Sequence, residues 1–171
     1  MKHSNQHFTL ITAAAAQWHD YELLLRSIDP NSDITLEDKS QEVGTLIVTG
    51  PKSRDLFNKI VDADLYLPWL SHQKAFINKV PVVMARVSFA GELGWEVHVQ
   101  NKYLNSIYDQ ILSLGAKPFG MFALNSLRIE KGYRAWKGDL SSDYSILEGG
   151  LERFVKFDKD IDFIGKPALL K

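Results

Sequence analysis

The sequence of 171 residues contains no cysteine, which excludes disulfide bonds, thiol nucleophiles and zinc sites that depend on sulfur ligands. The formal net charge is -1, so no global field attracts nucleic acid or an anionic membrane surface. No apolar run approaches the roughly 20 residues that a membrane-spanning helix requires. We therefore expect neither nucleic acid nor a membrane among the partners.

Several catalytic and nucleotide-binding motifs are also absent. The sequence has no phosphate-binding G-x-x-x-x-G-K-[ST], no dinucleotide-binding G-x-G-x-x-G and no G-x-S-x-G nucleophile turn. The five histidines, at positions 3, 7, 19, 72 and 98, match no metal-ligand spacing such as H-E-x-x-H. The sequence therefore gives no reason to expect ATP, NAD, a serine nucleophile or a metal ion.

The composition is that of an ordinary globular chain. Apolar residues make up 45% and charged residues 24%, which is typical of a soluble protein. The length allows one ordinary domain or two small ones. Residues 1–8 are polar and lack the apolar core of a secretory signal. We expect a cytoplasmic protein, with an organellar matrix as the alternative.

Hydrophobic periodicity predicts a mixture of strands and helices. Alternating or β-prone runs predict strands at 8–12, 34–36, 44–49, 76–78, 82–88, 95–99 and 154–157, with a turn near 79–81. Helical spacing predicts helices at 13–28, after Gly50-Pro51, at 102–114 and at about 120–131, with Gly115 and Gly132 ending the last two. Because strands and helices alternate irregularly around a hairpin, the pattern favours α+β over a doubly wound α/β sheet. We place a division near residue 75, after an apolar loop at 64–71.

Two glycines bracket a carboxylate between two of the predicted strands. Gly91 and Gly94 let a backbone or a ligand approach closely, and Glu92 would point into any cleft that the turn lines. A carboxylate can accept two parallel hydrogen bonds from adjacent ring and exocyclic N–H groups, such as a pterin presents. An ordinary hairpin turn with a solvated glutamate is the alternative.

A second segment of interest runs from residue 125 to residue 141. Arg128 falls near the C-terminal end of a predicted helix, where the dipole favours a cation and a ligand carbonyl or carboxylate could be its partner. A surface arginine with a weak ion pair is the alternative. Trp136 could stack on a flat heterocycle or pack in the core or a loop. Asp139 and Ser141 are typical of turns, in which they bond local backbone N–H groups.

Several segments taken together resemble one protein family, the aminomethyltransferases. Residues 86–96 resemble the family stretch R-x-S-[YF]-x-G-E-x-G-[WYF]-E, and residues 123–133 resemble its A-L-x-S-L-R-x-E-[KA]-G block. Residues 50–54 are similar to the G-P-x-[SA]-R helix start, and shorter matches follow in the family's order up to residue 166. The family includes the glycine-cleavage T-protein and the C-terminal halves of dimethylglycine and sarcosine dehydrogenases. Leu93 and Lys131 resemble the dehydrogenase branch, because T-protein usually has Asp and Ala there.

The resemblance implies a tetrahydrofolate site and a one-carbon transfer from an amine donor to tetrahydrofolate. Glu92 would hold the pterin, Arg128 would make a second folate contact, and Trp136 would line the pocket. No catalytic residue is identified in this chain, because the family's catalytic Asp lies upstream of the segment that matches 8–12. The family's C-terminal β-barrel would follow the last residue.

The implied fold is a partial aminomethyltransferase fold of the α+β class. Residues 1–75 would form the second half of a ferredoxin-like domain, and 76–171 would form a folate-lining domain with a mixed or antiparallel sheet and helices. Since a half domain leaves sheet edges unpaired, we expect self-association or a complementary chain, and the branch makes a flavoprotein partner plausible. The chain would act as an enzyme component, as a folate-binding module without turnover, or as a structural fragment.

Overall fold

The computed structural model describes residues 1–170 and divides into two compact units, Met1–Lys131 and Gly132–Lys171. Among the described residues, every strand belongs to the first unit. The division expected near residue 75 falls inside strand β2 (His72–Ile77), and the sheet joins strands from both sides of it. Among residues 1–170, no helix combines the length and the apolar character needed to cross a bilayer.

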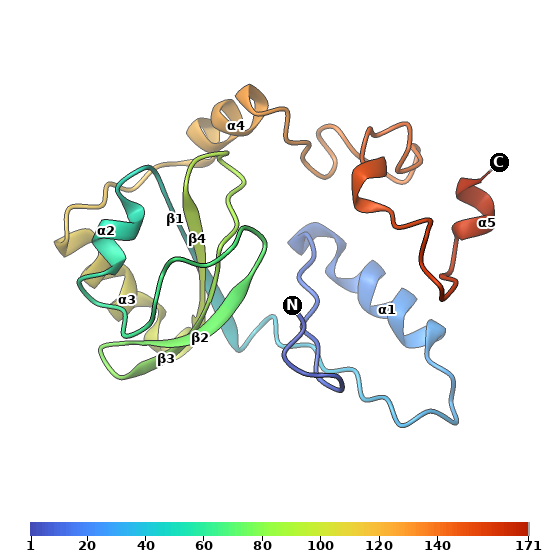
Figure 1. The fold of residues 1–171 in the computed structure, drawn as a ribbon, viewed down its shortest axis with the longest axis horizontal. Coiled ribbons are helices and arrows are strands. Elements are labelled where there is room, and N and C mark those ends of the chain that lie inside the picture. Colours follow the sequence, from blue (N-terminus) through green and yellow to red (C-terminus); the bar gives the residue numbers. More distant parts are fainter. Residues whose placement is uncertain (171) are drawn as a thin grey trace. The chain divides into compact units, whose positions relative to one another are not determined.

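Four antiparallel strands form one sheet in the first unit (Figure 1). Strands β1 (Val43–Thr49), β2, β3 (Val80–Ala85) and β4 (Gly94–Gln100) lie in the order β1-β4-β3-β2. Strands β2, β3 and β4 form consecutive antiparallel pairs, whereas β1 comes from far back in the sequence to pair with β4. A wholly antiparallel sheet with helices confirms the α+β class predicted from the sequence.

Helices α2 (Ser53–Phe57) and α3 (Asn101–Ser113) pack on one face of this sheet (Figure 1). The rings of Trp95 and Phe57 meet edge to face, with centroids 6.4 Å apart and planes at 86°, the geometry that ring quadrupoles favour. The buried core consists of Phe57, Leu65, Ala75, Ile77, Val82, Met84, Trp95, Val97, Val99, Ile107 and Ile111. The predicted alternation of β4 therefore places its apolar residues in the core.

The remaining predicted helices are present. They are a 3-10 turn η1 (Ala14–Ala16) continuing into α1 (Gln17–Ser27), and α4 (Met121–Glu130). Gly115 and Gly132 follow α3 and α4 with φ of 95° and 69°, the left-handed conformation expected of glycines that end helices. A short helix α5 (Lys166–Leu169), which the sequence analysis did not predict, lies in the second unit.

The hairpin between β2 and β3 turns one position earlier than predicted. Asn78 and Lys79 have φ of 46° and 68°, the two positive values that a two-residue hairpin turn of type I′ requires. Pro81, which we had placed in the turn, lies inside β3 opposite Phe76. Its missing N–H breaks no ladder bond, because the pairing of β3 with β4 begins at Val82.

Three of the predicted strands are wrong. Residues 8–12 take part only in a single bridge between Lys2 and Phe8, and 34–36 are irregular. Residues 154–157 begin in a 3-10 turn, η2 (Glu152–Phe154). An alternating pattern reports a tendency to bury one face, but a strand also needs a neighbour for its hydrogen bonds. Within residues 1–170 no named strand pairs with these segments.

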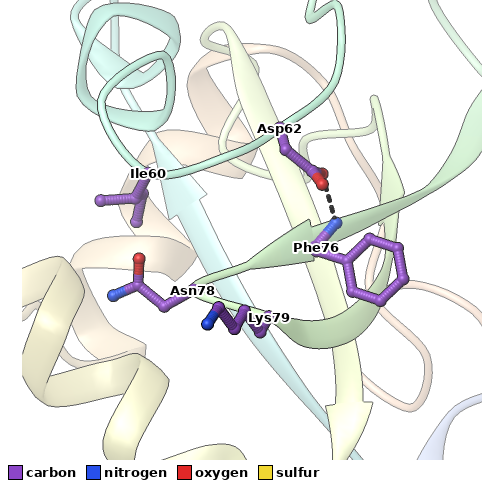
Figure 2. Close-up of a pocket in the computed structure, with 5 residues that line it drawn as sticks. All are labelled: Ile60, Asp62, Phe76, Asn78 and Lys79. Carbon is purple, nitrogen blue, oxygen red and sulfur yellow. Dashed lines mark hydrogen bonds between the residues drawn. The ribbon is translucent and has the colours of Figure 1, made fainter.

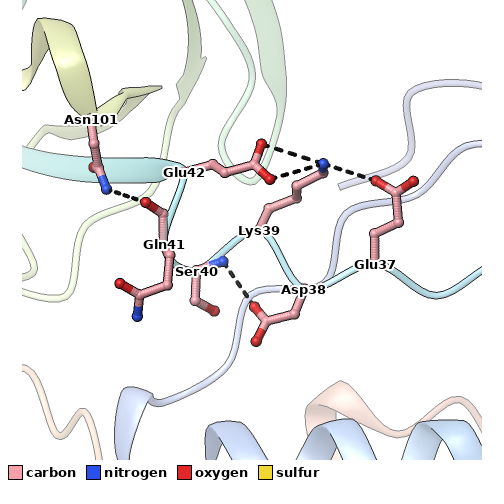
Figure 3. Close-up of polar contacts among 7 residues, drawn as sticks. All are labelled: Glu37, Asp38, Lys39, Ser40, Gln41, Glu42 and Asn101. Atoms are coloured by element: carbon pink, nitrogen blue, oxygen red, sulfur yellow. Dashed lines mark hydrogen bonds and ion pairs between the residues drawn. The ribbon is translucent and has the colours of Figure 1, made fainter.

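The segment that leads into β1 is fixed to the start of α3 (Figure 3). The side chain of Asn101 donates to the Gln41 carbonyl at 2.8 Å, and its backbone N–H donates to the Glu42 carbonyl at 2.9 Å. Lys39 pairs with Glu37 at 3.0 Å and with Glu42 at 3.2 Å, and these hydrogen bonds raise the pKa of its ammonium group. The bonds from Asn101 connect the segment to α3, whereas these ion pairs lie within the segment itself.

The core assignment predicts a large cost for Met84→Ala. The side chain has 0% exposure, so truncation leaves a cavity and should lower the free energy of unfolding by about 2–5 kcal/mol in urea denaturation. Met121→Ala is the matched control, because Met121 is 76% exposed and its loss should change stability by less than about 0.5 kcal/mol. Equal effects of the two substitutions would contradict the proposed core.

The turn geometry predicts that Lys79→Gly stabilises the protein. A non-glycine residue in the left-handed region is strained, and relief of that strain should exceed the added entropy of the unfolded chain by about 0.5–1 kcal/mol. Lys117→Gly, at a loop position outside the left-handed region, should lower stability instead. Thermal unfolding of the two variants measures the difference, and a destabilised Lys79→Gly variant would refute the turn assignment.

Candidate functional site

The turn that carries Glu92 leads directly into β4, at the end of the sheet where β1 ends. Gly91 has a φ of 77°, which favours glycine. A Cβ on Gly94 would come within 2.7 Å of the Ser88 Cβ, so this position has no room for a side chain. The tight glycine turn predicted from the sequence is therefore present, and it leaves the Glu92 side chain exposed.

The C-terminal end of α4 lies against this turn. A Cβ on Gly91 would be 1.9 Å from the Cγ of Lys131, so the lysine stem crosses the turn where a larger residue would sit. The guanidinium carbon of Arg128 lies 5.9 Å from the centre of the Phe89 ring, within the range of a cation–π contact. The structure thus brings Arg128 and the Glu92 turn together within the first unit.

Arg128 is one of the few charged residues that this structure buries. Only 6% of it is exposed, and its Nε donates to the Oδ1 of Asn125 one helical turn earlier at 2.8 Å. The surface position that we considered as the alternative is therefore wrong. A buried guanidinium needs hydrogen-bonding partners, and its fixed fork presents donors in a constant direction.

Trp136, the third predicted site residue, belongs to the second unit. Its side chain is 41% exposed, and its backbone forms a bridge with Leu140. The surrounding turn is closed by Asp139, whose carboxylate accepts the Ala135 N–H at 2.8 Å. Ser141 accepts the Asp143 N–H at 3.1 Å. The predicted turn roles of Asp139 and Ser141 are therefore confirmed.

His98 is buried on the face of the sheet opposite the core. Its Nδ1 lies 2.9 Å from the Oγ1 of Thr45 on the neighbouring strand. Its Nε2 lies 3.3 Å from a carboxylate oxygen of Glu96, but the angle does not make a hydrogen bond. The distance alone therefore overstates this contact, and His98 is held mainly by the cross-strand bond to Thr45.

Three other histidines cluster near the N-terminal end of the described chain. The ring of His3 lies 4.8 Å from that of His7 and 5.1 Å from that of His72, and its Nε2 lies 2.8 Å from the Thr9 hydroxyl. Burial, followed by the neighbouring His7 and His72, lowers the pKa of His3. No group of three or more His, Cys, Asp or Glu residues in the described part of the chain has the arrangement of a metal site.

A surface hollow of about 390 Å³ lies next to the β2–β3 turn, and Figure 2 shows the residues that line it. The strand pairing places this turn at the other end of the sheet from Glu92. It is lined by Ile60, Asp62, Phe76, Asn78 and Lys79. The Asp62 carboxylate accepts the Phe76 N–H at 2.7 Å, so one of its oxygens is already hydrogen-bonded to the backbone of β2. The hollow contains none of the predicted site residues, and we do not assign it a ligand.

Sequence reasoning missed the residues that support the Glu92 turn. Lys131 crosses Gly91, while the hydroxyls of Thr49 and Ser53 lie 3.3 and 3.2 Å from the Leu93 carbonyl. Ser53 lies in the family-like motif at residues 50–54 and Lys131 in the block at 123–133, but neither motif indicated a contact partner, and Thr49 belonged to no motif. Such contacts depend on the pairing of β1 with β4, which no local pattern specifies.

The comparisons with known proteins decide the family. The sequence model of the family described as the GCVT N-terminal domain matches residues 1–159. The chain belongs to this aminomethyltransferase family. Its place among aminomethyltransferases and dimethylglycine and sarcosine dehydrogenases, expected from its motifs, is thereby confirmed.

Three of its relatives show how much of a family protein the chain represents. It is 35% identical over 170 residues to human mitochondrial dimethylglycine dehydrogenase, covering 95% of this chain and 20% of that protein. It is 36% identical to mouse mitochondrial sarcosine dehydrogenase, covering 96% and 19%. It is 35% identical to the aminomethyltransferase of Thermoanaerobacter sp. (strain X514), covering 99% and 47%. The chain spans less than half the length of these relatives.

The packing of Lys131 across Gly91 predicts that Gly91→Ala destabilises more than Gly132→Ala. Both positions have positive φ, so each substitution should lower the free energy of unfolding by about 1–2 kcal/mol through backbone strain. Only the Gly91 Cβ meets another side chain, which should add about 1–3 kcal/mol of overpacking. Urea unfolding measures both. Adding Lys131→Gly to Gly91→Ala removes the Cγ, Cδ and Cβ that the new methyl would meet, so the excess over Gly132→Ala in the same Lys131→Gly background should disappear. A persistent excess would refute the contact.

Proposed function

We propose that this chain provides the tetrahydrofolate-binding part of an aminomethyltransferase, with Glu92 as the residue that grips the pterin. The observation that carries the proposal is the exposed carboxylate on a turn fixed by two glycines, beside an aromatic ring and a buried guanidinium. Family membership supports it, because the matched region includes the whole turn and α4.

The residues of the turn fit a reduced pterin. Glu92 is exposed, and among the described residues its carboxylate makes no ion pair, so both oxygens are available to a ligand. An ionised carboxylate accepts two parallel hydrogen bonds from two adjacent N–H groups, one on the ring and one exocyclic, and the charge makes these bonds roughly twice as strong as neutral ones. Phe89, three residues before Glu92 and 36% exposed, offers a flat apolar surface.

Arg128 supports the site in a different way from Glu92. With 6% exposure it has little surface for a ligand, and it binds Asn125 and lies against the Phe89 ring. We propose that it makes a folate contact and keeps the Phe89 ring in place. We also propose Trp136, which is 41% exposed, as a residue whose indole could stack on the folate.

The reaction that we propose is the transfer of a one-carbon unit from a small amine donor. Tetrahydrofolate, when bound, supplies the nitrogens that accept this unit. The residues of this chain bind and orient the pterin through Glu92, and the positioning itself lowers the barrier to transfer. In relatives the matched region is part of longer proteins, and we propose a flavoprotein or a complementary chain as the partner that supplies the amine-derived unit.

The direct test is titration of the full chain with tetrahydrofolate by calorimetry under reducing conditions. Glu92→Gln keeps the shape of the side chain but removes its charge, and it should weaken binding by about 10–150-fold, the equivalent of 1.5–3 kcal/mol. Because Glu92 is exposed, thermal unfolding of this variant should match that of the parent chain.

The matched control is Glu22→Gln. Glu22 is an exposed glutamate on α1 that pairs with Arg26, and its loss should leave the affinity for tetrahydrofolate unchanged. A parent chain that does not bind tetrahydrofolate, or a Glu92→Gln variant that binds as well as the parent, would refute the proposed function. Binding without transfer from any amine would identify a folate-binding module.

A further inference from the structure

One backbone carbonyl in the candidate site receives an unusual number of donors. The Leu93 carbonyl, one residue after Glu92, accepts the Gly50 N–H at 2.8 Å. The Thr49 hydroxyl lies 3.3 Å from the same oxygen and the Ser53 hydroxyl lies 3.2 Å from it. A carbonyl oxygen has two lone pairs, so three donors are more than it can bond at full strength. The bond from the Gly50 N–H alone would continue the strand ladder, and the two hydroxyls are additional to it.

The two hydroxyls come from parts of the chain that the β1–β4 pairing brings to the turn. Thr49 is the last residue of β1 and lies opposite Gly94, while Ser53 begins α2. Ser53 is only 4% exposed, and a hydroxyl buried to this extent requires a hydrogen-bonding partner. The partner that it finds is the Leu93 carbonyl.

The same contacts restrict the turn from its other side. The Thr49 hydroxyl lies 3.2 Å from the Ser88 hydroxyl, and Gly94 fits between these two side chains with no space for a Cβ. Since Leu93 follows Glu92 directly, a fixed Leu93 carbonyl restricts the backbone that sets the direction of the Glu92 side chain. Lys131 over Gly91 restricts the preceding residue.

We infer that Thr49 and Ser53 are positioning residues that hold the Leu93 carbonyl so that the Glu92 carboxylate faces the ligand in one orientation. The inference rests on the proposed function, because Glu92 is taken as the residue that binds the pterin. Under this inference the motif at residues 50–54 affects ligand binding indirectly, through the Leu93 carbonyl, without contacting the ligand. Preorganisation of this kind raises affinity by reducing the ordering that binding must impose.

The experiment compares hydroxyl-free variants in two backgrounds by calorimetric titration of the full chain with tetrahydrofolate. Thr49→Val, which keeps the β-branched shape, and Ser53→Ala should each weaken binding about 3–10-fold, in line with the loss of one neutral hydrogen bond. Thr49→Ser keeps the hydroxyl and should bind nearly as the parent chain does. In the Glu92→Gln background, Thr49→Val and Ser53→Ala should have no further effect, because their influence passes through the missing carboxylate.

A second readout does not depend on a ligand. NMR order parameters should show greater motion of the Glu92 amide in Thr49→Val and Ser53→Ala, with Thr49→Ser close to the parent chain. If Ser53→Ala does not fold, the Thr49→Val and Thr49→Ser pair alone decides the question.

The outcomes separate this inference from the proposed function. If Glu92→Gln weakens binding but Thr49→Val and Ser53→Ala do not, the positioning role is wrong and the function stands. If the hydroxyl-free variants weaken binding equally in both backgrounds, they act on the general fold, and the positioning role is again refuted. If Glu92→Gln binds as well as the parent chain, or the parent chain does not bind at all, both proposals fail.

Discussion

The pairing of β1 with β4 is the interaction on which the rest of the first unit depends. It joins residues about fifty positions apart, from Val43 opposite Gln100 to Thr49 opposite Gly94. On one face it completes the layer that α2 and α3 cover, with Trp95 against Phe57. At its end it delivers the start of α2 to the turn before β4. The core and the candidate site therefore both depend on the pairing of β1 with β4.

The pairing of β1 with β4 explains why two motifs that lie far apart in the sequence contact the same turn. The glycine-rich segment supplies Glu92, and the motif at 50–54 supplies a buried hydroxyl that reaches the next carbonyl along. The end of α4 adds Lys131 and the covered guanidinium of Arg128. The surroundings of the exposed Glu92 carboxylate are formed by all three segments together: the glycine-rich turn, the motif at 50–54 and the end of α4.

The sequence predicted those features that neighbouring residues decide. The helices, the strands of the sheet and the end-signal glycines follow from periodicity and from φ preferences, and the structure contains them. The prediction of a strand at 8–12 was wrong, because the apolar alternation is present but no named strand of the described chain pairs with this segment. The sequence also failed to predict the burial of Arg128, because the same helical spacing is compatible with a covered or a solvated guanidinium until the turn is placed against α4.

Strand β1 has a strand partner on one side only in the described part of the chain. Its seven residues, VGTLIVT, carry no charge and no proline, and Val43 and Ile47 are exposed to 38% and 39%. An uncharged, β-branched edge with a free row of backbone donors and acceptors is a template for another strand. In concentrated solution this edge is where chains of the protein would begin to adhere, and the outward-facing Ile47 is the position where a lysine would oppose aggregation with least disturbance of the core.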